Sequence, residues 1–420
     1  MNKLRFIALA LCAVTAFGLI CGCNDTKPAG TVSDGASSED SILSKTGKLS
    51  EDEMKLIASD RLTKCNDLMH FLTVDCYDKY TDRSQKLPLS SPEYYKVVHD
   101  GKYNINNISD IFLYVSSEIG SYFYSYKVSD LFINPHCFPY EYKTDNGTVL
   151  YSSGNIAPAF AELNDALYAK EYIVDSDEKY DIDNIDIIDK ADDFFTVNVN
   201  VLDSHTNAKI RTDMILFGYY SENKYLIKAV VENSTKLSGK ISEDKAKQTI
   251  PDLIDNYNRL DEFIMMANSV CCDENDVLQY SNGSYKKVLN KNQYSIDSYR
   301  SLVNLSSKVF DRISAEEFIG DNVYTGECPI SFTDENGKEV LTAEHGVINK
   351  YFVESKGQLY AGPVTVSNAS KLVGSDYKIL FSGNCLFVAE IKGVLYGNNN
   401  EFSETMVFVL TEDGYRISQL

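Results

Sequence analysis

Residues 194–220 read FFTVNVNVLDSHTNAKIRTDMILFGYY, and this stretch decides the fold class. In its first part every second residue is apolar, at positions Phe195, Val197, Val199 and Val201. A period of two predicts a β-strand that buries one face. Residues 203–207 (DSHTN) predict a turn, after which residues 210–220 return and residues 225–231 add a third strand. The sequence therefore predicts an antiparallel sheet here.

The end of the chain carries the same arrangement. Alternating, apolar-rich strands separated by polar turns are predicted at 385–396, 402–411 and 415–420. Tyr225 and Ile227 of the first copy have counterparts 190 residues later, at Tyr415 and Ile417. The match between the two ends indicates an internal repeat.

Each copy begins with a helix. The sequence SED occurs at 50–52 and again at 242–244, 192 residues later. In both, a serine suited to an N-cap precedes two acids, which the positive end of the helix dipole favours. Apolar residues follow at helical spacing in both copies, which predicts amphipathic helices with one buried face. Pro251 is expected either to kink the second helix or to begin its regular part.

The closest match between the copies lies after these helices. Residues 94–98 (YYKVV) align with residues 285–289 (YKKVL), 191 residues later. Each block predicts a short strand, then a loop, then a helix that starts near Asn107 or Ser298. The same elements are therefore expected in the same order in both copies.

A glycine turn that leads into an apolar strand occurs at 147–151 and at 357–360, and we match these two segments as well. The shared order divides the body into two repeats, residues 49–235 and 236–420. Helices followed by a twisted antiparallel sheet make an α+β fold, here in two tandem lobes. The order of elements resembles the cone-shaped, cystatin-like folds. The alternative is chance similarity between two generic α+β domains.

The first residues predict export. Two basic residues precede an apolar run at 6–19, which is short for a membrane-spanning helix and typical of a signal-peptide core. The small Gly22 directly before Cys23 resembles a bacterial lipobox. Residues 1–22 are therefore expected to be a lipoprotein signal peptide, and residues 23–48 the lipidated Cys23 and a flexible tether. The alternative is a plain secretory signal cut nearby.

Lipidation would place the protein on the outer face of a bacterial cell membrane. The tether would give a reach of roughly 25 to 30 Å. Seven cysteines follow Cys23, and export permits disulfides among them. Cys65 and Cys76 lie on an apolar helical stripe, which favours buried thiols. For Cys271 and Cys272 a packing position at a helix end is favoured over a metal pair.

Charge and motifs exclude several functions. Formal net charge is −21, which argues against nucleic-acid binding and against a polybasic membrane surface. The chain has no Trp, so a sugar platform built on Trp is excluded. No GxSxG, HExxH or CxxC motif occurs. We therefore expect no catalytic residue, no metal and no cofactor.

A cluster of acidic residues lies directly before the first alternating strand of the first repeat. It consists of Asp181, Asp183, Asp186, Asp189, Asp192 and Asp193. A Ca²⁺ loop requires oxygen ligands around a sharp glycine turn, and here isoleucines interrupt a segment without glycine. The favoured interpretation is a solvated acidic loop beside a strand.

The blocks at 94–111 and 285–302 resemble the IseA-like DL-endopeptidase inhibitor family. Each has a Tyr-rich strand, a loop, a helix and then a Gly-x-Leu-Tyr-like strand. The resemblance implies an exported protein of a Gram-positive bacterium, with cystatin-like α+β lobes that bind NlpC-type cell-wall hydrolases and block their active-site cleft. Two such lobes in tandem on a lipid anchor depart from the family pattern. The resemblance transfers no binding residue.

We therefore expect a non-enzymatic binding protein that inhibits cell-wall hydrolases, with hairpin loops at the sheet ends as contacts. The candidate binding residues are Ser204, His205, Thr206, Asn207, Asn398, Asn399 and Asn400. The alternative for these loops is that they are ordinary solvated hairpins. The alternative function is a small-ligand or envelope-polymer binding lipoprotein that uses the concave face of each sheet.

Overall fold

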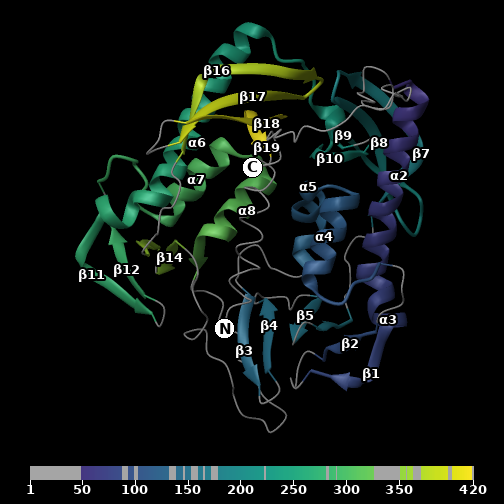
Figure 1. Cartoon of the computed structure of the whole chain (residues 1–420), viewed down its shortest axis with the longest axis horizontal. Coiled ribbons are helices and arrows are strands. Elements are labelled where there is room, and N and C mark those ends of the chain that lie inside the picture. Colours follow the sequence, from purple (N-terminus) through teal and green to yellow (C-terminus); the bar gives the residue numbers. More distant parts are fainter. Residues whose placement is uncertain are drawn as a thin grey trace, which may run out of the picture.

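The computed structural model describes residues 49–87, 93–98, 103–131, 139–144, 147–152, 159–163, 166–171, 178–221, 224–280, 283–289, 291–325, 351–355, 357–362, 370–395 and 400–418. The predicted signal peptide, Cys23 and the tether lie outside these residues, and so do Asn398 and Asn399. The fold is α+β, and in each lobe helices precede the larger antiparallel sheet (Figure 1).

The first lobe starts with a long helical segment and ends with a four-stranded meander. In chain order its elements are α2 (Glu51–His70), η3 (Phe71–Asp75), α3 (Cys76–Tyr80), β1 (Thr81–Lys86), β2 (Tyr95–Val97), α4 (Ile108–Glu118), α5 (Ser121–Phe123), η4 (Tyr124–Val128), η5 (Ser129–Leu131), β3 (Pro139–Thr144), β4 (Gly147–Ser152), β5 (Phe160–Leu163), β6 (Ala166–Ala169), β7 (Glu178–Lys190), β8 (Phe194–Asp203), β9 (Lys209–Ser221) and β10 (Lys224–Val231). A short turn, η6 (Ser234–Lys236), leads to the second lobe.

The second lobe repeats this order with fewer strands in its middle. Its elements are α6 (Glu243–Val270), β11 (Cys272–Tyr280), β12 (Gly283–Val288), α7 (Tyr299–Val309), α8 (Arg312–Asn322), β13 (Val323–Thr325), β14 (Phe352–Ser355), β15 (Gln358–Ala361), β16 (Ser370–Gly383), β17 (Leu386–Leu395), β18 (Glu401–Thr411) and β19 (Gly414–Ser418). The helices α4 and α7 begin directly after Asn107 and Ser298, as predicted.

Sheet order shows that the two lobes share the topology of the meander and of four strands in the smaller sheet. The far edges of the smaller sheets differ, because β4 pairs antiparallel with β5 whereas β13 pairs parallel with β14. The meanders run β10-β9-β8-β7 and β16-β17-β18-β19, and the smaller sheets run β1-β2-β6-β5-β4-β3 and β11-β12-β15-β14-β13. The hairpin β14–β15 adds to β12 as the hairpin β5–β6 adds to β2. The predicted match between residues 147–151 and 357–360 is therefore wrong. Both segments belong to hairpins, but β15 corresponds to β6, whereas β4 lies two strands further along.

The repeat extends to single hydrogen bonds. Asn66 on α2 donates from Nδ2 to the Tyr180 carbonyl and accepts from the Tyr180 N–H, both at 2.9 Å. Asn258 on α6 makes the same pair with Leu372, at 2.8 and 3.0 Å. Both partners are shifted by 192 residues. In each lobe the long helix is thus fixed to the first strand of the meander by an amide that satisfies both backbone groups.

The register of the meanders repeats as well. The pairing of β7 with β8 shifts between Tyr180 and Ile185, and that of β16 with β17 shifts between Leu372 and Tyr377. Each such bulge bends the strand and increases its twist. The sheets therefore curve around their helices at equivalent places.

Aromatic packing in the two cores is equivalent too. In the first lobe Phe195 stacks on Phe217 at 5.0 Å between ring centroids and meets Tyr225 edge-on. In the second lobe the same roles fall to Phe387, Phe408 and Tyr415, with a stacking distance of 4.5 Å. These rings lie on the helix-facing side of each meander.

Helix starts follow the sequence. Ser50 caps α2 in a capping box with Glu53, and Ser242 caps α6 by accepting from the Lys245 N–H. The helix α6 starts eight residues before Pro251 and continues through it, so Pro251 does not begin the helix. A side chain at Gly374 on β16 would come within 2.9 Å of the Pro251 Cα. The absence of one allows α6 to lie close against the sheet at that point.

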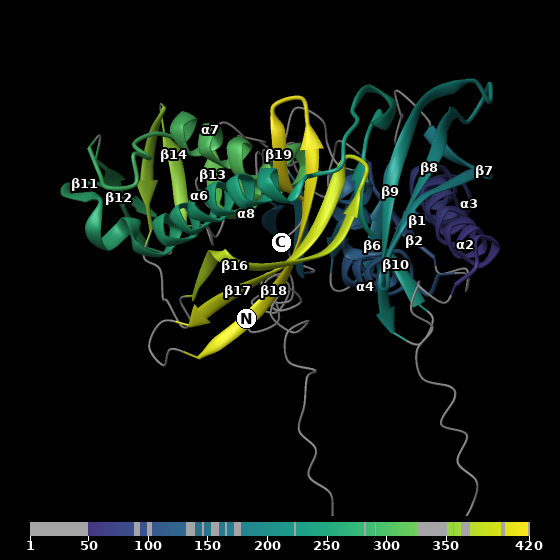
Figure 2. The same cartoon turned by 90° about the horizontal axis from the view of Figure 1, so that it is seen from above.

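The two lobes share an apolar core between their meanders. Buried side chains from β9 and β10 pack against side chains from β16, β17 and β18, and the cluster contains Met214, Leu216, Ala229, Val231, Phe381, Cys385, Leu386, Val388, Val407 and Val409. Both larger sheets lie side by side between the helices of the two lobes (Figure 2). The expectation that these sheets bury one face is therefore wrong for their central strands, because each lobe covers the second face of the other.

The acidic segment is a strand. Residues 181–189 lie within β7, so the predicted acidic loop is wrong for these positions, and only Asp192 and Asp193 lie in the following bend. Two irregularities in the pairing with β8 interrupt the period-two pattern. Ile185 is buried between exposed polar neighbours. Because the bulges break the alternation of apolar and polar residues, the sequence pattern did not identify this strand.

Three of the described cysteines lie in the buried positions that the sequence predicts for them. Cys65, Cys76 and Cys271 are buried as thiols, and Cys271 ends helix α6 as a packing residue. Within the described part of the chain, no helix is both long and apolar enough to cross a membrane.

Candidate functional site

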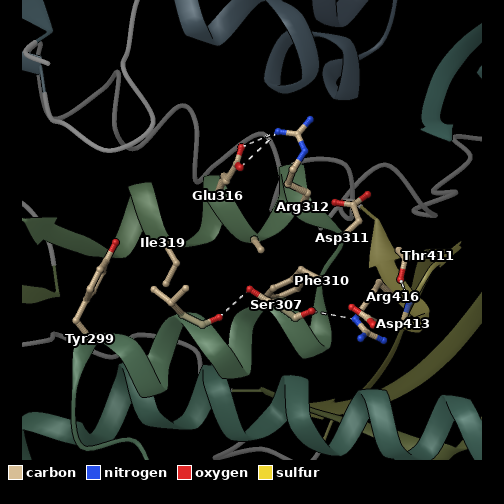
Figure 3. Close-up of a pocket in the computed structure, with 12 residues that line it drawn as sticks. Tyr299, Ser307, Phe310, Asp311, Arg312, Glu316, Ile319, Thr411, Asp413 and Arg416 are labelled. Carbon is tan, nitrogen blue, oxygen red and sulfur yellow. Dashed lines mark hydrogen bonds and ion pairs between the residues drawn. The ribbon is translucent and has the colours of Figure 1, made fainter. Parts of the chain in front are cut away.

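A groove in the second lobe is the candidate site among the residues that the structure describes. It has a volume of about 420 Å³ and runs between helices α7 and α8 toward the turn that joins β18 to β19. We call it the α7–α8 groove. Tyr299 stands at one end, and Asp413 and Arg416 stand at the other (Figure 3).

The middle of the α7–α8 groove is apolar. Val303 lines it from α7, Ala315 and Ile319 from α8, and Phe310 from the link between the helices. Phe310 is 1% exposed and contacts Phe318 at 5.2 Å and Tyr257 at 6.1 Å between ring centroids. Its ring is therefore held in place from behind.

Backbone contacts fix the corner where the two helices meet. The Asp311 N–H donates to the Ile417 carbonyl on β19 at 2.9 Å. The Asp311 side chain caps α8 by accepting from the Ser314 N–H at 2.8 Å. The helix α8 is also tied to the first lobe, because Ser125 donates to Glu317 at 2.8 Å. The groove walls are thus positioned before any ligand arrives.

Among the described residues of the first lobe, two aromatic rings occupy the position that is equivalent to the groove. Counting from the N-caps Asn107 and Ser298, Phe112 corresponds to Val303. Tyr124 corresponds to Ala315 by the same shift of 191 residues. Phe112 and Tyr124 touch edge to face, 5.1 Å between ring centroids. In the second lobe both rings are replaced by small side chains.

Two arginines border the α7–α8 groove, and both have partners. Arg416 donates from Nε to the Ser307 carbonyl and from Nη1 to the Tyr415 carbonyl, each at 2.9 Å. Burial lowers the pKa of Arg416, and Asp413 opposes this effect.

Arg312 is 63% exposed and pairs with Glu316 at 3.1 Å, while Glu232 of the first lobe lies 4.0 Å away. Burial acts to lower the pKa of Arg312, but Glu316 and Glu232 outweigh it, so that the pKa is raised.

The described residues of the predicted contact loops lie elsewhere. Residues 204–207 form a tight turn organised by Asp203, whose carboxylate accepts from the N–H groups of His205 and Thr206 at 3.1 and 2.7 Å. Asn207 adopts the left-handed conformation, φ 56°, that closes such a turn. Asn400 is exposed, and its carbonyl accepts from Leu395 at 3.0 Å. None of the described loop residues lines the α7–α8 groove.

Two half-buried carboxylates of the second lobe have raised pKa values. They are Asp261 on α6 and Glu404 on β18. Burial, with a smaller contribution from Glu262, raises the pKa of Asp261 to about 6. Burial and then Asp261 raise the pKa of Glu404. In the described residues no three His, Cys, Asp or Glu side chains come together as a metal site.

The raised pKa of Asp261 leads to a prediction about stability. When folding raises the pKa of an acid, that acid contributes stability that is fully present below its unfolded pKa. The contribution is lost as pH rises through the folded pKa, which is about 6 for Asp261. Asp261→Asn should therefore stabilise the protein at pH 7.5, by about 1 to 2 kcal/mol after allowance for partial exposure. The gain should vanish at pH 4, where the wild-type carboxyl is neutral. Thermal melts at both pH values measure this, and an equal effect at both would contradict it.

No family model matches the chain, and no curated protein matches it. The site must therefore be judged by its geometry. Sequence reasoning missed the α7–α8 groove, although the signal was present. The same shift of 191 residues that aligns residues 94–98 with 285–289 also aligns Phe112 with Val303 and Tyr124 with Ala315.

Proposed function

We propose that this protein is an exported lipoprotein, anchored through Cys23, that binds a basic extracytoplasmic protein and does not catalyse a reaction itself. NlpC-type DL-endopeptidases are the proposed partners, and lowered hydrolase activity is the proposed consequence. The carrying observation is the α7–α8 groove, open in one lobe where the equivalent position of the other lobe is filled.

The chemistry of the groove supports binding over catalysis. Its lining residues include no His or Cys, and the Ser307 hydroxyl donates to the Val303 carbonyl within its own helix. Nucleophilic catalysis requires a base within hydrogen-bond reach of the nucleophile. The groove instead combines an apolar centre with a charged border, as protein interfaces do.

Net charge supports a basic partner. The chain carries a formal net charge of −21. A field of this sign speeds encounter with a positively charged protein and disfavours anionic wall polymers. The alternative, a small ligand or polymer bound on the concave face of each sheet, has less room, because the helices of each lobe pack on that face of the meander.

A peptidoglycan-digestion assay tests this function. The host's own NlpC-type DL-endopeptidases would digest purified wall in the presence and absence of the full mature chain in detergent. We expect digestion to slow in proportion to the chain added, with saturation at micromolar concentration or below. Unchanged rates for every host hydrolase of this type would overturn the proposed function.

A further inference from the structure

We propose, resting on the binding function above, that the α7–α8 groove accepts an aromatic side chain presented by a basic segment of the partner protein. The occupant is specified by the first lobe, by the shape of the groove and by the charges on its border.

In the first lobe, aromatic side chains of the chain itself occupy the position that is equivalent to the α7–α8 groove. Tyr124 is 6% exposed there and packs edge-on against Phe112. The scaffold behind the two positions is the same in both lobes, because Ile111 and Leu302 are each fully buried at equivalent places. A frame shaped for aromatic rings is therefore retained in the second lobe without the rings.

The corner behind the rings is also retained. In the first lobe the Ile227 N–H donates to the Ile119 carbonyl at 2.8 Å, and in the second lobe the Asp311 N–H donates to the Ile417 carbonyl at 2.9 Å. In both cases the link between the two helical segments is joined to the last strand of the meander. The spacing of the helices is thus set by the sheet and does not depend on the rings.

Size and lining suit an aromatic side chain. A volume of about 420 Å³ lies within the range of pockets that bind small groups. Tyr299 and Phe310 line it and can offer ring contacts, which prefer offset or edge-on geometry. Because the walls are already fixed, an entering ring loses its own freedom but does not have to order the site.

The charges at the border of the groove favour a partner segment that carries basic residues beside its aromatic ring. Arg312 and Glu316 form an ion pair in which the two charges offset each other, whereas Arg416 keeps its positive charge because it donates to neutral backbone carbonyls. The turn between β18 and β19 adds two exposed acids, Glu412 and Asp413. The border is therefore more acidic than basic, in agreement with the net charge of −21.

The first test fills the groove with the residues of the first lobe. The double variant Val303→Phe/Ala315→Tyr restores an aromatic pair that the same frame already holds in the first lobe, so it is expected to melt like the wild type. Its affinity for an NlpC-type hydrolase that binds the wild type should fall at least about tenfold, the loss of one anchor residue. Leu113→Phe, which adds a ring at a 61% exposed position of α4, is the matched control and should bind as the wild type.

The second test does not depend on the hydrolase. The probes are two synthetic peptides, Lys-Gly-Phe-Gly-Lys and Lys-Gly-Ala-Gly-Lys, added at millimolar concentration to methyl-labelled protein. The Phe peptide should shift the NMR signals of Val303, Ala315 and Ile319, and the Ala peptide should not. The filled double variant should show no shift of Ile319 with either peptide.

The outcomes separate the two proposals. A hydrolase that binds the wild type and the filled variant equally would overturn the groove assignment and leave the proposed function standing. Methyl shifts with the Phe peptide, without any hydrolase binding, would support the groove and overturn the hydrolase partner. Equal shifts from neutral N-acetyl-phenylalanine amide would overturn the basic segment and assign the groove to small aromatic molecules. Absence of any shift and of any hydrolase binding would overturn both.

Discussion

A chain that lacks residues 414–420 is expected to lose about 3 to 6 kcal/mol of unfolding free energy, since two buried apolar side chains are removed at roughly 1.5 to 3 kcal/mol each. Those side chains are Tyr415, 8% exposed, and Ile417, fully buried. The truncation also removes the carbonyl that holds Asp311 at the corner of α7 and α8. The strand β18 would become an unprotected edge.

Denaturant melts measure this loss. Ile417→Ala is the matched single change and should destabilise by about 2 to 5 kcal/mol without exposing the edge of β18. A chain that lacks only residues 419–420 retains β19 and serves as the control. An unchanged midpoint in the longer truncation would contradict the role given to β19.

Leu216→Asp is expected to separate the folding of the two lobes. Leu216 is fully buried on β9 in the core shared with β16, β17 and β18. An unpaired carboxylate there should weaken the interface by roughly 4 kcal/mol or more. The wild type should melt in one transition and the variant in two, or in one at a much lower temperature.

A control on the same strand distinguishes the interface from the strand itself. Ile210→Asp lies on β9 at a 47% exposed position and should change stability by at most about 0.5 kcal/mol. Calorimetry of both variants makes the comparison. Equal melts for Leu216→Asp and the wild type would show that the lobes do not depend on their shared core.

The sequence predictions that the structure confirms rest on local patterns, namely helix N-caps and the alternation of apolar and polar residues in strands. Ser50, Ser242, Asn107 and Ser298 are N-caps because their short polar side chains satisfy N–H groups that a helix start leaves open. The alternation of Phe195 to Val201 identified a strand because its neighbours on the other face are polar. Both signals depend on residues within one turn or one strand.

Signals that depend on distant partners were misread. Met214 to Phe217 is a continuous apolar run, which indicates burial on both faces, but nothing local shows that the second cover is the other lobe. The acids of β7 were placed in a loop because bulges broke their alternation. The α7–α8 groove was missed because it consists of side chains that are smaller than their counterparts, a difference that shows only when the two repeats are aligned residue by residue.

The stoichiometry of the proposed complex tests the central claim most directly, because the described residues leave a groove open in the second lobe and place two aromatic rings at the equivalent position of the first lobe. Calorimetric titration of the full mature chain with an NlpC-type DL-endopeptidase that it inhibits should give one hydrolase per chain, and the Val303→Phe/Ala315→Tyr variant should weaken that single site. Two equal sites per chain, or one site that the filled groove does not affect, would contradict the account.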